Sequence, residues 1–536
     1  MGRVISTCLS VLSIAAAVLA GCGGGASVAG DAGDPSVPPV GSTPSAPVDG
    51  PAWTQFGATA QHAALSASAA QDLGRVRWRV PVDLAPPYRP SGALLAHYGS
   101  PVVTSHNTVL VPVKTGATGG FRVEARAGGN GVLLWSADTD YVMPAHNWAP
   151  SYNLALSSTN RVYAPGAGGK LLYRDNADTA SSAAAWQTFV FYGSAAYNSA
   201  PTAFDQSVFI NTPITVDAQG NAYFGFVVTG ANPAGLTSGI ARVAADGSGT
   251  WASAATLAGD ATIAKVAMNS APAVSIDGQT VYVVVNAASA ATPVGVQYGN
   301  LLALDSQALT LRRRASLVDP NTGVLARISD DATSSPLVGP DGDVYIGVLE
   351  SAQASHNGRG WLLHFNATLA SAKTPGSFGW DNTPSIVPAS MVPSYAGGSS
   401  YLLLTKYNNY AGTPSGDGRN RVAVLDPNAV QADPVSASVT VMQEVLTILG
   451  QTPDPAAPAG GVKEWCINTA AVDPATRSVL INSEDGHLYR WDLSTNQFTQ
   501  RIQMNNGVAQ SYTPTAIGAD GAVYAVNNAA LHSIGR

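Results

Sequence analysis

Short runs of apolar and β-branched residues recur along most of the chain, and turn residues separate them. The clearest unit starts with a small residue and Pro, continues as a β run, and turns at Asp or Gly. It then resumes as a second β run centred on Tyr or an aliphatic residue. Four copies lie at 212–224, 271–283, 335–346 and 513–525. Strand-length runs with such turns predict antiparallel strands, and four close copies indicate an internal repeat.

Weaker copies of the unit fill the gaps between the clear ones. They begin at Ser100, Ala149, Thr383 and Thr469, the last without the proline. The eight starts are separated by roughly 45 to 85 residues, which is typical of propeller blades. Further β runs follow several starts, so that each unit predicts a four-stranded antiparallel sheet.

The last repeat is too short to make a complete blade, because the chain ends at Arg536 soon after the start at Thr513. The run Arg75–Pro81 near the N-terminus offers the missing strand. Pairing the two would cover edges that otherwise stay exposed. The pattern therefore predicts an all-β protein, an eight-bladed β-propeller of four-stranded antiparallel blades whose last blade is closed by an N-terminal strand.

Composition and charge agree with this fold and exclude one class of partner. The 536 residues include 55 Gly and 35 Pro, and only 11% are charged, so that turns are abundant and helix-forming residues scarce. The net charge is −7 and basic residues are scattered. This does not match a nucleic-acid-binding surface.

The N-terminus has the pattern of an export signal. Arg3 precedes an apolar run at 11–20 and then Leu19-Ala20-Gly21-Cys22. The apolar run is shorter than the roughly 20 residues that span a bilayer, and it ends at small residues as a cleaved signal does. The motif resembles the lipobox of bacterial lipoproteins, which implies a signal peptide at 1–21 and lipidation of Cys22. Gly23 favours, by the same resemblance, the outer membrane, with the protein facing the periplasm or the cell surface.

The segment after Cys22 predicts no packed structure. Residues 23–50 are Gly, Ala, Ser, Pro, Val and a few Asp, without an aromatic residue. Such a composition buries too little apolar surface to offset the entropy of ordering. We expect 22–50 to be a lipidated cysteine with a flexible tether, and 51–536 to be a single propeller domain. After cleavage Cys466 has no disulfide partner within the chain.

The repeat resembles that of the quinoprotein alcohol dehydrogenase-like propellers (pyrroloquinoline-quinone repeats), which pair a Ser-Pro strand start with Leu-Asp and Gly-x-x-x-Trp segments. Residues 125–135, 302–305 and 489–492 are similar to those segments, and 53–57 with Gln61-His62 resembles the first segment of these proteins. The resemblance covers about residues 52 to 536. Within this family, the quinone-dependent dehydrogenases have an adjacent cysteine pair, a calcium held by acidic and amide side chains, and a catalytic Asp. This chain has no adjacent cysteine pair. Another member, the propeller lipoprotein of the outer-membrane β-barrel assembly machine, is non-catalytic.

Insertions are expected on one face of the disc. Connections between the first and second strands are tight. Those between the second and third strands and from one blade to the next lie on the other face, and they hold insertions at 229–238, 286–298, 350–359 and 407–420. Long loops on a rigid scaffold are often binding sites. They also arise by neutral drift.

Polar residues just before each innermost strand are expected to ring a funnel at the channel mouth on that face. They are His97, Tyr98, His146, Asn147, Trp148, Asn269, Asp330, Asp331, Asp381, Asn382, Lys463, Glu464, Trp465 and Tyr512. Such groups can bind a small polar ligand or a divalent cation, or they are polar turn residues. The chain has no Gly-x-Ser-x-Gly, His-Glu-x-x-His or phosphate-loop motif.

Two functions fit these patterns. The first is a non-catalytic binding or scaffold lipoprotein of the cell envelope, with a protein or glycan partner on the elaborated loops. The second is an envelope oxidoreductase or another small-molecule enzyme with its site in the funnel, for which the family resemblance implies pyrroloquinoline quinone with calcium. The catalytic residues and any metal ligands of such an enzyme are not identified by the sequence.

Overall fold

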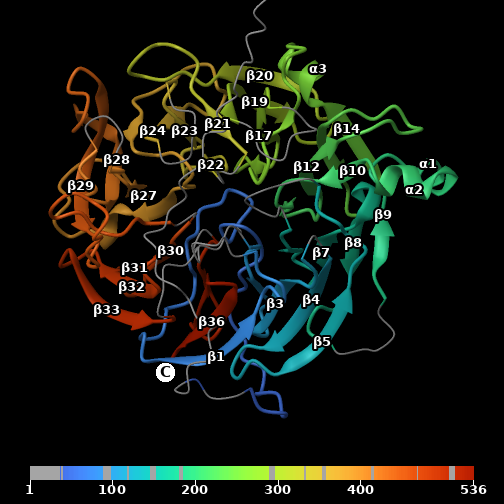
Figure 1. Cartoon of the computed structure of the whole chain (residues 1–536), viewed down its shortest axis with the longest axis horizontal. Coiled ribbons are helices and arrows are strands. Elements are labelled where there is room, and N and C mark those ends of the chain that lie inside the picture. The colour runs from blue at the N-terminus through green and yellow to red at the C-terminus, as the bar shows by residue number, and fades with distance from the viewer. Residues whose placement is uncertain are drawn as a thin grey trace, which may run out of the picture.

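The chain folds into a ring of antiparallel sheets around a central axis (Figure 1). The computed structural model describes residue 37 and residues 40–87, 98–117, 120–144, 152–179, 185–288, 296–330, 334–352, 358–411, 416–466, 469–505 and 513–536. Helices are short: α1 (Ser194–Ser199), α2 (Pro201–Asp205) and α3 (Ala254–Ala258), with 3-10 turns η1 (Ala167–Gly169) and η2 (Ala389–Met391). None of the described helices is long and apolar enough to cross a membrane.

Eight blades make up the ring, and the strands of each blade run in order from the innermost outward. Blade 1 is β2 (Val102–Val103), β3 (Thr108–Lys114), β4 (Phe121–Ala127) and β5 (Leu133–Asp138); blade 2 is β6 (Ala155–Leu156), β7 (Val162–Pro165), β8 (Leu171–Arg174) and β9 (Gln187–Phe189). Blade 3 is β10 (Val208–Ile210) with β11 (Thr215–Val216), β12 (Ala222–Val228), β13 (Gly239–Val243) and β14 (Gly249–Ser253); blade 4 is β15 (Lys265–Val266) with β16 (Ala273–Val274), β17 (Thr280–Asn286), β19 (Gly299–Asp305) and β20 (Leu311–Ser316).

The second half of the ring repeats the arrangement. Blade 5 is β22 (Leu337–Val338), β23 (Val344–Leu349), β24 (Gly360–Phe365) and β25 (Gly376–Ser377); blade 6 is β26 (Ser385–Pro388), β27 (Tyr401–Tyr407), β28 (Arg421–Ala432) and β29 (Thr440–Leu449). Blade 7 is β30 (Ala471–Asp473), β31 (Ser478–Asn482), β32 (His487–Asp492) and β33 (Gln497–Gln503); blade 8 is β34 (Ala516–Ile517), β35 (Val523–Asn527), β36 (Ala530–Gly535) and β1 (Arg75–Pro81). A small separate sheet joins β18 (Val296–Gln297) to β21 (Ile328–Ser329).

The eight-bladed fold and its closure are confirmed. Strand β1 pairs antiparallel with β36, from Arg75 opposite Gly535 to Pro81 opposite Ala530. Arg77 also forms an ion pair with Asp520 of the same blade, with 2.8 Å between Nη1 and Oδ2. The outermost strand of the last blade therefore comes from the N-terminal side of the chain.

The Asp/Gly turn of the repeat has a local cause. Asp217 Oδ1 accepts hydrogen bonds from the backbone N–H groups of Gln219 (3.0 Å) and Asn221 (2.8 Å). Gly220 has a φ of +84°, a conformation that costs glycine little. The same Asp-to-N–H bond occurs at Asp277–Gln279, Asp341–Asp343 and Asp520–Ala522. This turn fixes the register between the first and second strands.

The Tyr of the repeat joins neighbouring blades. Tyr223 of blade 3 donates its hydroxyl to the carbonyl of Ser306 in blade 4 at 3.0 Å. Tyr282 of blade 4 donates to the carbonyl of Ala367 in blade 5 at 2.6 Å. Both rings are buried between sheets, and Tyr345 of blade 5 makes the corresponding bond to a hydroxyl of blade 6. The repeat residues therefore form contacts between blades in addition to the strands within each blade.

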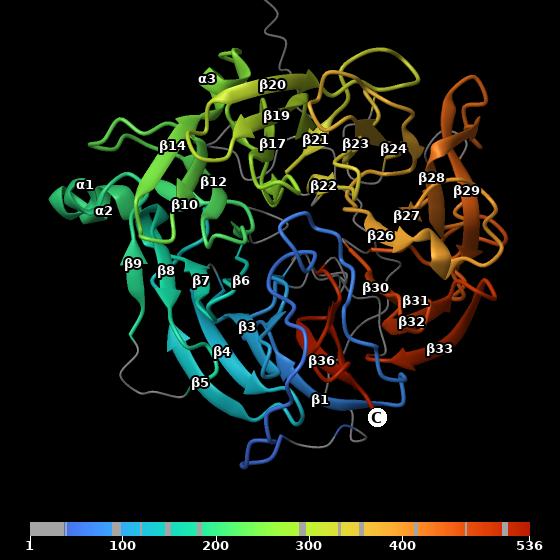
Figure 2. The ribbon, with the colours of Figure 1, turned by 180° about the vertical axis from the view of Figure 1, so that it is seen from behind.

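Residues 53–66, which we call the plug segment, cross the centre of the ring (blue in Figures 1 and 2). One inner-strand N–H from each of blades 1 to 7 donates to this segment. The pairs are Val103–Trp53, Leu156–Thr54, Val216–Gln55, Val274–Ala60, Val338–Gln61, Ile386–Ala63 and Val472–Ala64. Most donors are the last residues of their strands, beside the tight turns. The plug segment therefore closes the channel on the tight-turn face.

His62 fixes the middle of the plug segment. It is fully buried, and its Nδ1 lies 2.7 Å from the carbonyl oxygen of Pro336. Because a carbonyl only accepts, Nδ1 carries the proton. Phe56 packs against the imidazole in a T-shaped arrangement with 5.1 Å between ring centroids. Burial lowers the pKa of His62 to about 4, so the ring is neutral.

Candidate functional site

The four predicted insertions begin and end on the same face. They connect β12 to β13, β17 to β19, β23 to β24 and β27 to β28, which are second-to-third strand connections in blades 3 to 6. The blade-to-blade connections lie on this face too. We call it the elaborated face, and it is opposite the face that the plug segment closes.

Only some of the predicted funnel residues belong to the described part of the chain. His97, His146, Asn147, Trp148, Asp331 and Tyr512 lie outside the described residues, as does Cys22. The structure does place Tyr98, Asn269, Asp330, Asp381, Asn382, Lys463, Glu464 and Trp465.

Asp330 lies in a buried polar cluster at the start of blades 4 and 5. Its Oδ2 accepts from Lys265 Nζ at 2.5 Å, and its Oδ1 accepts from Asn286 Nδ2 at 2.9 Å and from the N–H of Met268 at 3.2 Å. Asn269, another predicted funnel residue, donates to the Asp330 carbonyl at 3.5 Å. The structure thus brings two predicted residues together and adds Lys265 and Asn286.

Two further buried aspartates are also paired with lysines. Asp381 forms a buried ion pair with Lys406, and the neighbouring Asn382 donates to Thr405 Oγ1 at 3.1 Å. In blade 1, Lys114 Nζ lies 3.1 Å from Asp83 Oδ1. The hydroxyl of Tyr98 donates to the second oxygen of this carboxylate at 2.8 Å.

None of these three lysines was predicted from the sequence. Each is a lone charged residue in an apolar strand: Lys114 ends β3, Lys265 begins β15, and Lys406 is the penultimate residue of β27. A buried lysine needs a carboxylate partner. A lone lysine at the end of an apolar strand could therefore have indicated a buried ion pair.

The Lys–Asp pairs decide whether these aspartates could bind the calcium ion that the family resemblance implies. A calcium ion requires carboxylate and carbonyl oxygens that are available to it. Both oxygens of Asp330 already accept hydrogen bonds, and the charge of Asp381 is balanced by Lys406. The two described funnel aspartates therefore do not fit a calcium ion.

A different cluster forms beside blade 7. Glu464, Cys466 and Glu484 each offer one ligand atom, and these atoms lie within 4.8 Å of one another. Cys466 Sγ lies 3.1 Å from Glu484 Oε2, and the N–H of Glu464 donates to Glu484 Oε1 at 3.1 Å. Burial, with the nearby charge of Glu464, raises the pKa of Glu484 to about 8. Cys466 and Glu484 were not predicted.

The residues flanking this cluster have structural contacts. Lys463 Nζ pairs with Asp454 Oδ1 at 3.0 Å. Trp465 is buried, and its indole packs against Tyr489 and Phe498 in the blade core. Trp465 therefore does not line an open funnel, although the sequence placed it there with Lys463.

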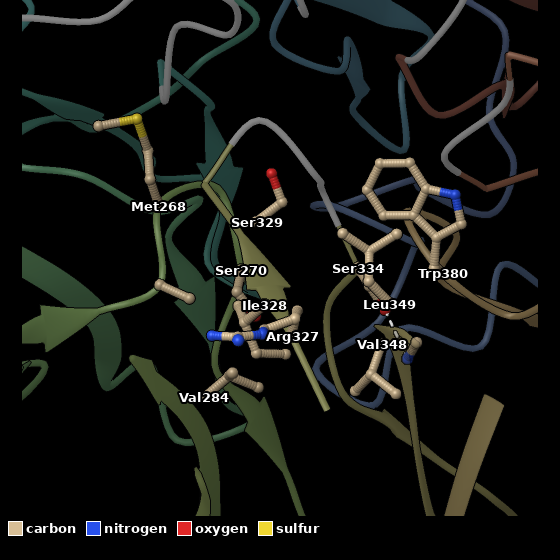
Figure 3. Close-up of a pocket in the computed structure, with 12 residues that line it drawn as sticks. Met268, Ser270, Val284, Arg327, Ile328, Ser329, Ser334, Val348, Leu349 and Trp380 are labelled. Carbon is tan, nitrogen blue, oxygen red and sulfur yellow. Dashed lines mark hydrogen bonds between the residues drawn. The ribbon is translucent and has the colours of Figure 1, made fainter. Parts of the chain in front are cut away.

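A narrow pocket opens between blades 4 and 5 (Figure 3). It has about 280 Å³ of empty space, including its opening to solvent. Met268, Arg327 and Trp380 line it, together with the hydroxyls of Ser270 and Ser334. Ser270 Oγ is buried, and within the described ranges it has no hydrogen-bond partner. The pocket suits a water molecule or one small polar group.

An ordered hairpin on the elaborated face exposes aliphatic side chains. Residues 317–326, which we call the aliphatic hairpin, link β20 to β21, with Val318 opposite Leu325. Asp319 fixes the hairpin, because its Oδ2 accepts from both the N–H and the hydroxyl of Ser351 at 2.8 Å. Val318, Val324 and Leu325 are 37%, 59% and 39% exposed. Three aliphatic residues are thus held in a rigid, exposed position.

Comparison with known proteins bears on the fold. No family model matches the chain, and no curated protein matches its sequence. The solved structure of quinohemoprotein alcohol dehydrogenase from Comamonas testosteroni is similar, with a TM-score of 0.54 and 12% identity over 91% of this chain and 81% of that chain. A europium-containing methanol dehydrogenase has a TM-score of 0.50 and 10% identity over 88% and 89% of the two chains.

A further solved structure, BamB from Moraxella catarrhalis, has a TM-score of 0.40 and 10% identity over 85% of this chain and 98% of that chain. The family resemblance inferred from the repeat is confirmed for the fold. This chain is an eight-bladed β-propeller, and its fold is similar to that of the two dehydrogenases.

Proposed function

We propose that this propeller is a non-catalytic binding module of the cell envelope, and that it holds a protein partner on its elaborated face. The aliphatic hairpin carries the proposal. Isolated exposed aliphatic residues are ordinary, but this hairpin presents three of them on one short, hydrogen-bonded unit. Apolar side chains of this kind form the cores of protein interfaces. They favour a protein partner over a glycan.

The rest of the elaborated face supports the proposal. The buried Lys–Asp pairs hold its base rigidly, because each charge is satisfied within the fold. A rigid base reduces the entropy lost when a partner binds. The plug segment closes the channel on the tight-turn face. The elaborated face, with its longer loops, is the opposite side.

The export signal completes the proposal. A signal peptide at 1–21 with lipid on Cys22 would place the propeller in the envelope, held to a membrane by the chain that follows Cys22. Without the anchor, the same face would still be a binding surface. The two parts of the proposal are therefore tested separately.

Site-specific photo-crosslinking in intact envelopes tests the partner. A photoreactive residue at position 324 is expected to give a discrete protein adduct. The matched control is position 276 on the tight-turn face, because Ile276 is 58% exposed, close to the 59% of Val324. Equal adducts at both positions, or none at 324, would refute the proposal.

A substitution test follows from the same surface. With the crosslinker at 318, the double variant Val324→Ser/Leu325→Ser is expected to lose the adduct, whereas Ile276→Ser keeps it. Both are surface changes, so thermal stability should stay close to that of the wild type. Labelling with a radioactive fatty acid, with and without Cys22→Ala, tests the anchor independently.

A further inference from the structure

The Glu464–Cys466–Glu484 cluster differs from the three carboxylates that pair with buried lysines. Asp83, Asp330 and Asp381 each lie against a buried lysine. Glu484 is equally buried, but in the described part of the chain it forms no ion pair with a lysine or arginine. The nearest lysine, Lys463, is instead paired with Asp454. A buried carboxylate without a cationic partner is costly.

The possible metal ligands in the cluster are of two chemical kinds, a thiol and carboxylates. Glu464 and Cys466 come from the segment before β30, and Glu484 from the turn between β31 and β32. Two separate segments thus bring a thiol and two carboxylates within 4.8 Å of one another. Around a tetrahedral zinc ion, with bonds of about 2.0 to 2.3 Å, ligand atoms lie roughly 3.4 to 3.8 Å apart. The cluster needs to contract by only about 1 Å to reach that geometry.

We infer that Glu464, Cys466 and Glu484 form a binding site for a borderline-soft divalent cation of the zinc type. A thiolate ligand selects zinc over calcium or magnesium, which take oxygen ligands alone. Three protein ligands leave a fourth position for water or a ligand. On binding, the thiol and any protonated carboxyl release their protons to solvent. The ion then supplies the positive charge that Glu484 does not receive through an ion pair with any described residue.

The site would also link two parts of the elaborated face. Trp465, between the two ligands of the first segment, receives a hydrogen bond at its carbonyl from Asn408 Nδ2 at 3.2 Å. Asn408 follows β27 and belongs to the insertion at 407–420. An ion held by Glu464 and Cys466 would therefore stiffen this insertion. The inference does not depend on the partner-binding proposal.

Cobalt substitution in the full chain tests the site, because a cobalt–thiolate bond gives a charge-transfer absorption in the near ultraviolet. After chelation and dialysis, one equivalent of Co²⁺ is expected to give this absorption, and Zn²⁺ is expected to abolish it by displacing the cobalt. Cys466→Ser should lack the band, which separates this thiol from Cys8 and Cys22. Glu484→Gln should weaken cobalt binding at least tenfold.

Two controls keep the inference falsifiable. Glu350→Gln changes another acidic residue of the elaborated face, one paired with Arg359, and should leave the cobalt titration unchanged. If Cys466→Ser does not fold, Glu464→Gln and Glu484→Gln still test the site through the band. An absent band in the folded wild type, or an unchanged band in Cys466→Ser, would overturn the inference. Stabilisation by Ca²⁺ equal to that by Zn²⁺ would also overturn it.

Discussion

The plug segment makes a testable prediction through His62. We consider His62→Asn, because an amide can replace Nδ1 as the donor to the Pro336 carbonyl. Asn also tolerates the φ of +64° at this position. The substitution removes the titrating group and the ring contact with Phe56. The lost packing should destabilise the protein at pH 7 by about 1 to 3 kcal/mol.

The pH dependence gives the sharper test. The folded pKa of His62 is about 4 against an ordinary 6.5, so the unfolded chain takes up a proton first as pH falls. The stability that His62 contributes is present above pH 6.5 and is lost between pH 6.5 and 4. At roughly 1.4 kcal/mol per pKa unit, this loss is about 3 kcal/mol.

Urea denaturation followed by tryptophan fluorescence at pH 7, 5.5 and 4 measures the effect. From pH 7 to pH 4 the wild type should lose about 3 kcal/mol more free energy of unfolding than His62→Asn. His106→Asn, a change at an exposed histidine whose pKa is raised by its hydrogen bond to Asp49, should not reduce this acid-induced loss. An equal loss in His62→Asn and wild type would show that the plug segment does not bury a neutral imidazole.

Further predictions concern the blades and the funnel. Tyr282→Phe removes the hydrogen bond to the half-buried Ala367 carbonyl, so it should lower the free energy of unfolding by about 0.5 to 1.5 kcal/mol in urea denaturation. Tyr298→Phe, whose hydroxyl bonds at the surface to Thr262, should change it by less than about 0.5 kcal/mol. Asp330→Ala leaves Lys265 buried without its partner and should cost about 3 to 5 kcal/mol, whereas a Lys265→Met/Asp330→Leu double variant should recover most of that loss. Pyrroloquinoline quinone with calcium should neither raise the melting temperature nor develop the bound cofactor's absorbance; an increase that depends on both would favour the oxidoreductase alternative.

The strands were predictable from the sequence because they depend on local chemistry. The Asp–Gly turn and the buried Tyr recur at a spacing that indicates a hairpin. The additional β run at 75–81 supplies the strand that the last blade lacks after Thr513. The proximity of Asn269 and Asp330 was predictable too, because both precede neighbouring inner strands, and the two residues are hydrogen-bonded.

The rest of the site depends on contacts between distant segments. Lys265 and Asp330 are separated by 65 residues along the chain, and no local pattern pairs them. Glu484 looks like one more residue of a tight turn, and only the fold brings it to Cys466. Trp465 follows a charged pair, which favours an exposed position, yet blade 7 buries its indole.

The N-terminal part of the described chain runs along one face of the propeller. Gly50 donates to the Ser105 carbonyl at 2.9 Å, and Ser45 donates to Asn130 Oδ1 at 3.2 Å. Both partners lie in turns on the tight-turn face. Residues 45–50 therefore lie on that face, opposite the long loops. The chain that would carry the proposed lipid therefore enters the propeller on the side away from the proposed binding surface.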